Sequence, residues 1–239
     1  MGGTVPRGAF VGWGSGSGSD ILMRMIAQRM TERLGRQVVV ENRPGAGGAV
    51  ASEFVAKSLP DGHTLLTMSI SYAVIPASHK NLNYDPVRDF APIALLVKTP
   101  QVMAVNDTSP LTSLKDLIAA AKKTPGALTY GSAGIGTTGH ILGAFFNQAA
   151  GIDIVHVPYK GSTPGLVALV SGEVTMMFSN VDNSQPHIKS GRARALAVTS
   201  AQRAATLPQV PTMGEAGIKD FVVLSWFGLL APAATPPAI

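Results

Sequence analysis

The sequence contains no cysteine in its 239 residues. This excludes disulfide bonds, thiolate metal sites and cysteine nucleophiles. Charge is also scarce, because Asp, Glu, Lys and Arg make up only 14% of the chain, whereas hydrophobic residues make up 46%. The composition is typical of a globular protein with a buried core and excludes a disordered chain. The apolar stretches are all shorter than the 18 residues that a membrane-spanning helix needs.

Several enzyme signatures are missing as well. The sequence has no G-x-S-x-G nucleophile motif, no H-E-x-x-H zinc motif and no G-x-x-x-x-G-K-[ST] phosphate loop. No two of its histidines stand at a metal-ligand spacing. We therefore expect no metal, no cofactor and no catalytic residue. The histidines are His63, His79, His140, His156 and His187.

The net charge of +5 raises the question of nucleic-acid binding. The densest basic group is Arg24, Arg29, Arg33 and Arg36, which lies opposite the apolar stripe of the first expected helix and is interleaved with Glu32. Such a pattern is typical of a solvated helix face. With no zinc-finger, RNP or basic-zipper motif beside it, we predict no nucleic-acid partner.

Strand and helix signals alternate along most of the chain, which predicts an α/β fold with parallel sheets. The first helix is expected to begin at Asp20, as its N-cap, and to stop at Gly35. The capping box of the 113–123 helix has Asp116 where glutamate is usual. The other expected elements are a helix at 47–58, a strand at 63–68, one or two strands at 93–105 interrupted at Pro100, and strands at 154–157, 174–178 and 193–198.

Two glycine-rich loops each join a strand to a helix. The first follows the strand Phe10–Trp13. The second lies in Thr129–His140, inside a stretch from Thr124 to Ile152 that has no Lys, Arg, Asp or Glu. Such turns present backbone N–H groups at a helix N-terminus, where the helix dipole adds partial positive charge. The two loops predict two lobes that face one small acidic ligand.

Polar side chains also follow other expected strands, at the carboxyl ends where α/β proteins bind ligands. They are mostly hydroxyl and amide groups, which favours selective binding by hydrogen bonds over proton-transfer chemistry. Together with the two loops they form the predicted ligand-binding set. It comprises Trp13, Ser15, Gly16, Ser17, Ser19, Asp20, Ser69, Ser71, Ser132, Gly134, Gly136, Thr137, Thr138, Tyr159, Asn180 and Asp182.

An alternative function stays open at this point. Gly134–Gly139 fits G-x-G-x-x-G, as in a dinucleotide site, and would make the protein a nucleotide-binding or hydrolytic α/β enzyme. Asp153 has about the right separation for the ribose-binding acid, but it starts its strand, whereas that acid should end one. His140, in the first turn of its helix, is expected to be a structural hydrogen-bonding residue.

Seven segments of the sequence together form a specific pattern. They are Val38-Val-Val-Glu-Asn-Arg-Pro-Gly-Ala-Gly-Gly48, Pro60-Asp-Gly-His-Thr-Leu-Leu66, Tyr84-Asp-Pro-Val-Arg-Asp-Phe-Ala-Pro-Ile93, Tyr130-Gly-Ser-Ala-Gly-Ile-Gly-Thr137, His156-Val-Pro-Tyr-Lys-Gly161, Arg194-Ala-Leu-Ala-Val-Thr-Ser200 and Leu207-Pro-Gln-Val-Pro-Thr212. In these segments the chain resembles the Bug-type (TctC-like) solute receptors of tripartite tricarboxylate transporters. The resemblance extends from about residue 10 to the end of the chain.

The resemblance implies a two-lobed periplasmic-binding-protein fold (type II, Venus-flytrap) with a ligand cleft between lobes at 1–100, joined by the return segment 226–239, and at 101–225. The implied protein is a non-enzymatic, monomeric periplasmic receptor whose signal peptide has been removed. It closes on a small carboxylate, such as a dicarboxylate, an acidic amino acid or an aromatic acid, and delivers it to integral-membrane transporter subunits. The loops Trp13–Asp20 and Ser132–Thr138 match the family's carboxylate-holding loops.

Two features depart from the family pattern. The first loop usually reads Pro-Phe-x-Pro-Gly-Gly, but Gly12-Trp-Gly-Ser-Gly-Ser17 replaces it here, which adds an aromatic wall and hydroxyl groups. An aromatic or aryl carboxylate is the ligand that this change favours. The family also continues for about fifty residues beyond Ala231–Pro236, so its C-terminal helices are expected to be absent from this chain.

Overall fold

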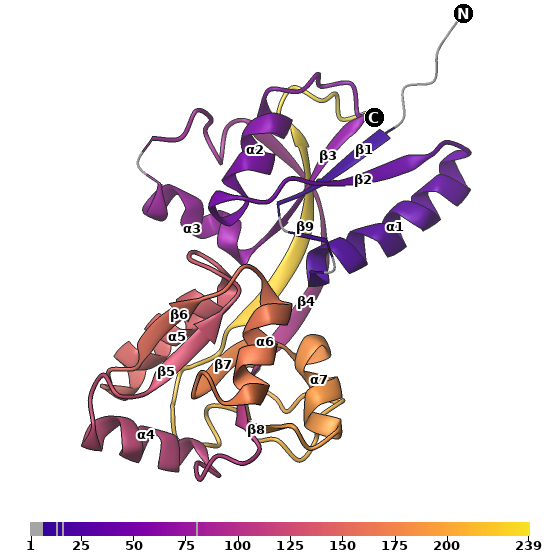
Figure 1. Ribbon diagram of the computed structural model, residues 1–239. Helices are drawn as coiled ribbons and strands as arrows, with labels where there is room; N and C mark the ends of the chain where they lie inside the picture. The colour runs from indigo at the N-terminus through magenta and orange to yellow at the C-terminus, as the bar shows by residue number, and fades with distance from the viewer. Residues whose placement is uncertain (1–6, 13, 16, 80) are drawn as a thin grey trace, which may run out of the picture. The chain divides into compact units, whose positions relative to one another are not determined.

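The computed structural model describes residues 7–12, 14–15, 17–79 and 81–239. The chain divides into two compact units, which are described separately. Unit 1 comprises the residues up to Lys98 together with Trp226–Ile239, and unit 2 comprises Thr99–Ser225. Two strands, β4 and β9, each contribute residues to both units (Figure 1).

Unit 1 is a mixed sheet with helices on both faces. Its strand order is β2-β1-β3-β9, in which β1 runs parallel to β2 and β3, and β9 runs antiparallel to β3. The elements are β1 (Arg7–Val11), α1 (Gly18–Leu34), β2 (Val38–Asn42), a 3-10 helix (Ala46–Gly48), α2 (Ala49–Ala56), β3 (Thr64–Ser69), α3 (Ile70–Ser78), the start of β4 (Phe90–Asn106) and most of β9 (Leu224–Pro232).

Alternation along β1 explains this layering. Ala9 and Val11 pack in one cluster with Met23 and Ala27 of α1, whereas Phe10 packs in another with residues of α2 and α3. Successive strand residues point to opposite faces, so an apolar run such as Ala9–Val11 can bury itself only between two helical layers.

Unit 2 repeats this plan. Here β5 runs parallel to β6 and β7, while β7 and β8 run antiparallel to β4. The elements are the rest of β4, α4 (Leu114–Lys123), β5 (Thr129–Ser132), α5 (Thr138–Ala150), β6 (Val155–Pro158), α6 (Ser162–Ser171), β7 (Met176–Asn180), α7 (Val181–Lys189) and β8 (Ala193–Val198). The expected α/β class is therefore confirmed, and the sheets expected to be parallel are mixed, because β9 runs antiparallel to β3, and β4 runs antiparallel to β7 and β8.

Helix α5 packs very closely on the strands beneath it. A Cβ added at Gly143 would lie 2.1 Å from the ring of Tyr130 in β5, and one added at Gly139 would lie 2.8 Å from the carbonyl oxygen of Phe178 in β7. Buried Leu142 and Phe146 complete the contact. These glycines bring the beginning of α5 against the carboxyl ends of β5 and β7.

Some expected boundaries were wrong. Strand β4 continues through Pro100 as one strand. Its pairing with β7 begins at Gln101, so the missing proline N–H falls before that ladder. Helix α3, which contains Pro76, was not expected. Within the described residues, no helix has the length and apolar character needed to cross a membrane.

Candidate functional site

The loop before α1 in unit 1 is closed by its own serine. Ser17 is the N-cap of α1, and its Oγ accepts a hydrogen bond of 3.3 Å from the Asp20 N–H. The expectation that Asp20 is the N-cap is therefore wrong, because the hydroxyl three residues earlier takes that position. Asp20 lies in the first turn instead. Trp13 and Gly16, which belong to the same predicted site, lie outside the described residues.

The Asp20 carboxylate is buried and bonded within unit 1. Arg24 Nε donates to its two oxygens at 3.0 and 3.1 Å, and Asn42 Nδ2, at the end of β2, donates to Oδ1 at 2.9 Å. Ser15 Oγ donates to Asn42 Oδ1 at 3.1 Å, and the hydroxyls of Ser17 and Ser19 lie 3.1 Å apart. The network ties the loop to β2, and it places the protein's own carboxylate in the first turn of α1.

Ser69 and Ser71 lie at the same edge of the unit 1 sheet. Val11 at the end of β1 pairs with Thr67, two residues before Ser69, so the loop after β1 and the end of β3 are neighbours. Ser69 caps α3, because its Oγ accepts a hydrogen bond of 3.3 Å from the Ser71 N–H. Both serines are buried. The structure thus places Ser15, Ser17 and Ser69 at one edge of the unit 1 sheet.

The loop before α5 in unit 2 is organised around Ser132. The Ser132 side chain is fully buried; its Oγ accepts a hydrogen bond of 3.1 Å from the Gly134 N–H and lies 2.7 Å from His156 Nε2. Gly134 and Gly136 have φ values of 130° and 77°, which other residues rarely adopt. The glycines therefore allow the chain to turn sharply between β5 and α5.

Helix α5 begins without a side-chain cap. Thr137 occupies the N-cap position, but its hydroxyl donates to the Gly134 carbonyl at 2.7 Å and not toward the helix. The N–H groups of Thr138, Gly139 and His140, which like those at any helix start have no acceptor within the helix, therefore receive no side-chain cap from Thr137. Because this segment also carries no charged side chain, the helix start offers N–H groups and partial positive charge to an anion.

Two histidines support this loop, and sequence reasoning identified only one of them. His140 Nδ1 accepts a hydrogen bond of 3.1 Å from the Gly136 N–H, which confirms its expected structural role. His156 stacks on His140 with ring centroids 4.2 Å apart, and on Tyr130 at 4.8 Å. His156 was missed, although strand alternation places it beside Tyr130, its register partner in β5.

Burial keeps both imidazoles neutral at neutral pH. Desolvation lowers the pKa of His140 below its ordinary value. Desolvation, aided by repulsion from His140, lowers the pKa of His156 from 6.5 to about 4. The positive character of this loop therefore comes from oriented N–H groups, not from imidazolium.

Three other predicted residues have mixed surroundings. The Tyr159 N–H donates to the Ser132 carbonyl at 3.0 Å, whereas its hydroxyl donates to Glu173 at 2.7 Å. Burial and this bond raise the pKa of Tyr159 to about 12. Asn180 is bonded to the buried Gln101, and Asp182 is exposed in the first turn of α7. Tyr159 thus supports the Ser132 loop through its backbone, while Asp182 makes no described contact with that loop.

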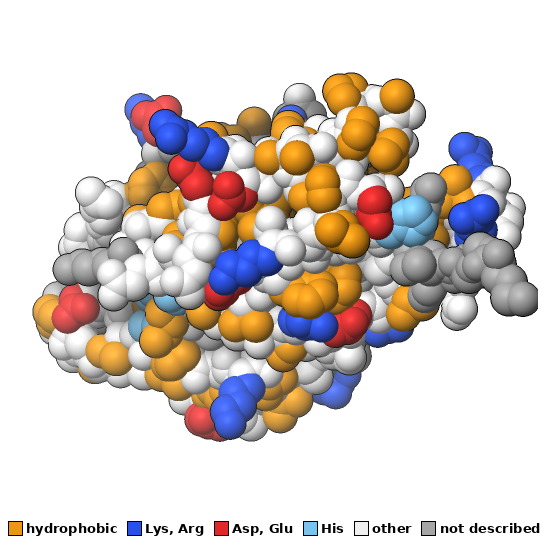
Figure 2. All heavy atoms as spheres, turned by 90° about the horizontal axis from the view of Figure 1, so that it is seen from above, with side chains coloured by type: hydrophobic (Ala, Val, Ile, Leu, Met, Phe, Trp, Pro, Cys, Tyr) orange, Lys and Arg blue, Asp and Glu red, His pale blue; other side chains and the backbone are white. Residues whose placement is uncertain are grey.

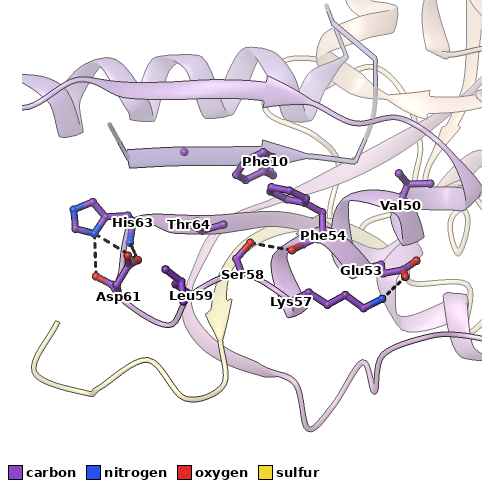
Figure 3. Close-up of a pocket in the computed structure, with 11 residues that line it drawn as sticks. Phe10, Val50, Glu53, Phe54, Lys57, Ser58, Leu59, Asp61, His63 and Thr64 are labelled. Carbon is purple, nitrogen blue, oxygen red and sulfur yellow. Dashed lines mark hydrogen bonds and ion pairs between the residues drawn. The ribbon is translucent and has the colours of Figure 1, made fainter. Parts of the chain in front are cut away.

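A separate hollow of about 690 Å³ lies elsewhere in unit 1 (Figure 3). Phe10 and Phe54 lie side by side along it, and the Lys57–Glu53 and Asp61–His63 pairs border it. Gly8 and Thr64, at the amino ends of β1 and β3, also line it. It is therefore at the opposite end of these strands from the predicted binding loop.

On the face shown in Figure 2, acidic and basic side chains are interspersed among apolar ones and do not form a single basic area. Among residues 7–12, 14–15, 17–79 and 81–239, no three histidine, aspartate or glutamate side chains gather as metal ligands would.

Comparison with known sequences identifies the family. The family model described as "Tripartite tricarboxylate transporter family receptor" matches residues 22–239. A protein encoded in the tcbD–tcbE intergenic region of Pseudomonas sp. (strain P51) is 40% identical over 94% of this chain and 67% of its own length. Protein BugT of Bordetella pertussis (strain Tohama I) is 38% identical over 94% of this chain and 69% of its own. The chain spans about two thirds of these relatives.

Solved structures show the same likeness. A structure described as a periplasmic transporter has a TM-score of 0.90 and 41% identity, over 96% of this chain and 77% of its own. The structure of R. palustris Rpa4515 with adipate has a TM-score of 0.90 and 36% sequence identity, over 98% of this chain and 79% of its own. The structure of MatC from Rhodopseudomonas palustris with bound malate has a TM-score of 0.89 and 32% sequence identity, over 97% of this chain and 79% of its own. The fold is that of periplasmic binding proteins, and the chain belongs to the tripartite tricarboxylate transporter family of solute receptors.

Proposed function

We propose that this protein binds a small carboxylate as a solute receptor and delivers it to integral-membrane transporter subunits. The observation that carries the proposal is the uncapped start of α5, where the N–H groups of Thr138 and Gly139 face no helical acceptor beside an uncharged glycine loop. Relatives with the same fold are described with adipate and with malate, both of which are dicarboxylates.

In this proposal the first carboxylate of the ligand accepts hydrogen bonds from the beginning of α5. The Thr138 hydroxyl adds a further donor, and the helix dipole neutralises part of the charge. Ser17 and Ser69 of unit 1 supply hydroxyl donors for the rest of the ligand, while Ser15, whose hydroxyl donates to Asn42, holds the loop in place. The two units then close around it by rotation at the crossings near residues 98–99 and 225–226.

The receptor works as a monomer in the periplasm and does not convert its ligand. The Gly134–Gly139 motif, which also fits a nucleotide loop, serves here as an anion loop. Asp153 precedes β6, which begins at Val155, and so it lies at the amino end of that strand. That is the wrong end for a ribose-binding acid, so the nucleotide alternative loses the residue that it needs.

A thermal-shift screen tests the proposal directly. L-malate, adipate, acidic amino acids and aromatic acids are compared with adipamide, which has the shape of adipate without its charges, and with NAD and ATP. A bound carboxylate should stabilise the protein by about 2.7 kcal/mol at a hundredfold excess over Kd. A shift with a nucleotide alone, or with adipamide as large as with adipate, would reject a carboxylate receptor.

A further inference from the structure

The glycine loop of unit 2 is tied to helix α5 by one imidazole. The Gly136 N–H donates to His140 Nδ1 at 3.1 Å, across one turn of chain. His140 is the third residue of α5, the position from which a glutamate reaches back to the loop in a capping box. The Thr137 hydroxyl is already used on Gly134, so His140 supplies the side-chain link between Gly136 and the helix.

The chemistry of this bond determines the protonation state of His140. A backbone N–H can only donate, so Nδ1 must carry a lone pair, and the ring proton must reside on Nε2. An imidazolium carries protons on both nitrogens and has no acceptor. The bond to Gly136 therefore exists only while His140 is neutral.

A second imidazole reinforces the first. His156 stacks on His140, and its Nε2 is hydrogen-bonded to Ser132 Oγ, which accepts the Gly134 N–H. The two histidines thus reach the two glycines with positive φ, Gly136 directly and Gly134 through the Ser132 hydroxyl. Their close stacking also makes it unfavourable for both rings to be charged together.

Few other titratable groups face the pair. The titratable residue that β5 contributes is Tyr130, which stacks on His156 and whose hydroxyl donates to the His140 carbonyl at 3.4 Å. Burial raises the pKa of Tyr130, so its hydroxyl stays neutral. None of the five residues of strand β7 has a titratable side chain. Lys219 and Asp220 are exposed beside Phe221, which packs farther along α5 on Phe145 and Phe146. In the described chain, neither imidazole forms an ion pair with a carboxylate.

We propose that His140, supported by His156, is a proton-sensitive positioning residue for the carboxylate loop. This inference rests on the proposed function and adds its regulation: the loop keeps its binding conformation while His140 is neutral and loses it when His140 takes up a proton. Carboxylate is therefore bound at neutral pH and released as the medium acidifies. The effect is separate from protonation of the ligand itself.

Two substitutions at one position isolate the effect. His140→Asn retains an acceptor near the place of Nδ1 but does not titrate, and His140→Leu has similar bulk without an acceptor. Kd for L-malate and for adipate is measured by calorimetry at half-unit steps from pH 7.5 to pH 4.5. Protonation of the ligand affects all three proteins equally, so the difference between the curves of the original protein and H140N reports only the imidazole.

We expect H140N to bind within about threefold of the original protein at pH 7.5, and H140L to bind about five- to tenfold more weakly, the equivalent of one lost hydrogen bond. Below the pKa of His140, the affinity of the original protein should fall by up to about tenfold per pH unit relative to H140N. Parallel pH curves for these two proteins, or tighter binding by the original at acid pH, would overturn the proposal.

A measurement without ligand separates this proposal from the receptor function. In protein labelled with ¹⁵N, the His140 ring should show the Nε2–H tautomer, and protection of the Gly136 amide from exchange should fall on acidification in the original protein but not in H140N. A constant Gly136 protection would refute the loop mechanism even if malate binds. Failure of every carboxylate to bind, with Gly136 behaving as expected, would reject the receptor function and its regulation but leave the His140 bond established.

Discussion

The loops before α1 and α5 have similar glycine and hydroxyl content, yet they differ at the atoms that would meet an anion. At α1, Ser17 caps the helix, and Asp20 brings a carboxylate into the first turn, where Arg24 and Asn42 hold it. At α5, the N-cap hydroxyl turns away, and no acidic side chain is present in the first turn. The beginning of α1 thus has a side-chain cap and a carboxylate from the protein itself, whereas the beginning of α5 has neither.

This difference separates two roles that glycine-rich loops share in sequence. A helix dipole attracts one negative charge, whether it comes from a side chain or from a ligand. Because Asp20 supplies that charge at α1, we expect the loop of unit 1 to contribute hydroxyl groups, and the loop of unit 2 to provide the main carboxylate site. The following experiments make one loop resemble the other.

The largest effect is expected from Thr138→Asp, which gives α5 an acid in its first turn as α1 already has. The new carboxylate would occupy the helix start and repel the ligand, so affinity for malate or adipate should fall by about 100-fold or more. The helix itself should gain about 0.3–1 kcal/mol. Calorimetry measures the first effect and urea unfolding the second.

The control for this change is Gln148→Glu, which adds the same charge to exposed helix surface near the end of α5. It should leave carboxylate affinity within about twofold and cost a few tenths of a kcal/mol in stability. If Q148E weakens binding as much as T138D, net charge and not the helix start determines affinity.

The next effect compares Ser132→Ala with Ser15→Ala. Ser132 is fully buried, and its removal leaves the Gly134 N–H and His156 Nε2 without their partner, which should cost about 1–3 kcal/mol and weaken carboxylate binding. Ser15 is exposed, so its loss should change stability by less than about 0.5 kcal/mol. Equal losses in urea unfolding would contradict the assigned difference between the two loops.

A smaller effect is expected for Asp20→Asn. The amide keeps the shape but loses the charged bonds to Arg24, whose half-exposed side chain can turn to water, so the cost should be about 1–2 kcal/mol. Glu32→Gln, which breaks the exposed pair with Arg29, should cost about 0–0.5 kcal/mol. If Asp20 serves the fold and not the ligand, carboxylate affinity should change far less in D20N than in T138D.

A further effect is a pH dependence of stability that arises in unit 2. The pKa of His156 is lowered from 6.5 to about 4, so between these values the unfolded chain takes up a proton that the folded chain does not. The free energy of unfolding should therefore be unaffected by His156 above pH 6.5 and should decrease as the pH falls from 6.5 toward 4. His156→Gln keeps a polar group toward Ser132 without titrating. Thermal melts from pH 7.5 to 4 should fall less steeply in this variant, and an unchanged slope would count against the assignment.

Local signals in the sequence were sufficient for several elements. Ser113 caps α4 with the Asp116 N–H at 3.2 Å, as the Ser-x-x-Asp pattern predicts, and Gly35 ends α1 in the left-handed conformation. What failed depends on distant partners. Strand β4 extends through Pro100 because it pairs with residues such as Asn180, about eighty positions away, and no local window contains that information.

The candidate site shows the same division. Glycine and hydroxyl placement was enough to locate the loop at Ser132–Thr138, because those residue types permit the turn. Which N–H groups stay available was not visible, since it depends on where the hydroxyls of Ser132 and Thr137 point. His156 arrives from the neighbouring strand to hold the former. The one local sequence signal for this arrangement was His140, which stands three residues after Thr137, at the position of a capping-box acid.

The place of β9 in unit 1 has a consequence for how the chain is made. Residues 99–225 form unit 2 without interruption, so all its strands are available once that stretch has left the ribosome. The sheet of unit 1 is complete only after β9 has been synthesised, because β9 pairs with β3 from a position more than 150 residues later in the chain. Its sheet therefore keeps an open edge at β3 throughout synthesis of unit 2, and this edge is where a chaperone would find the nascent protein.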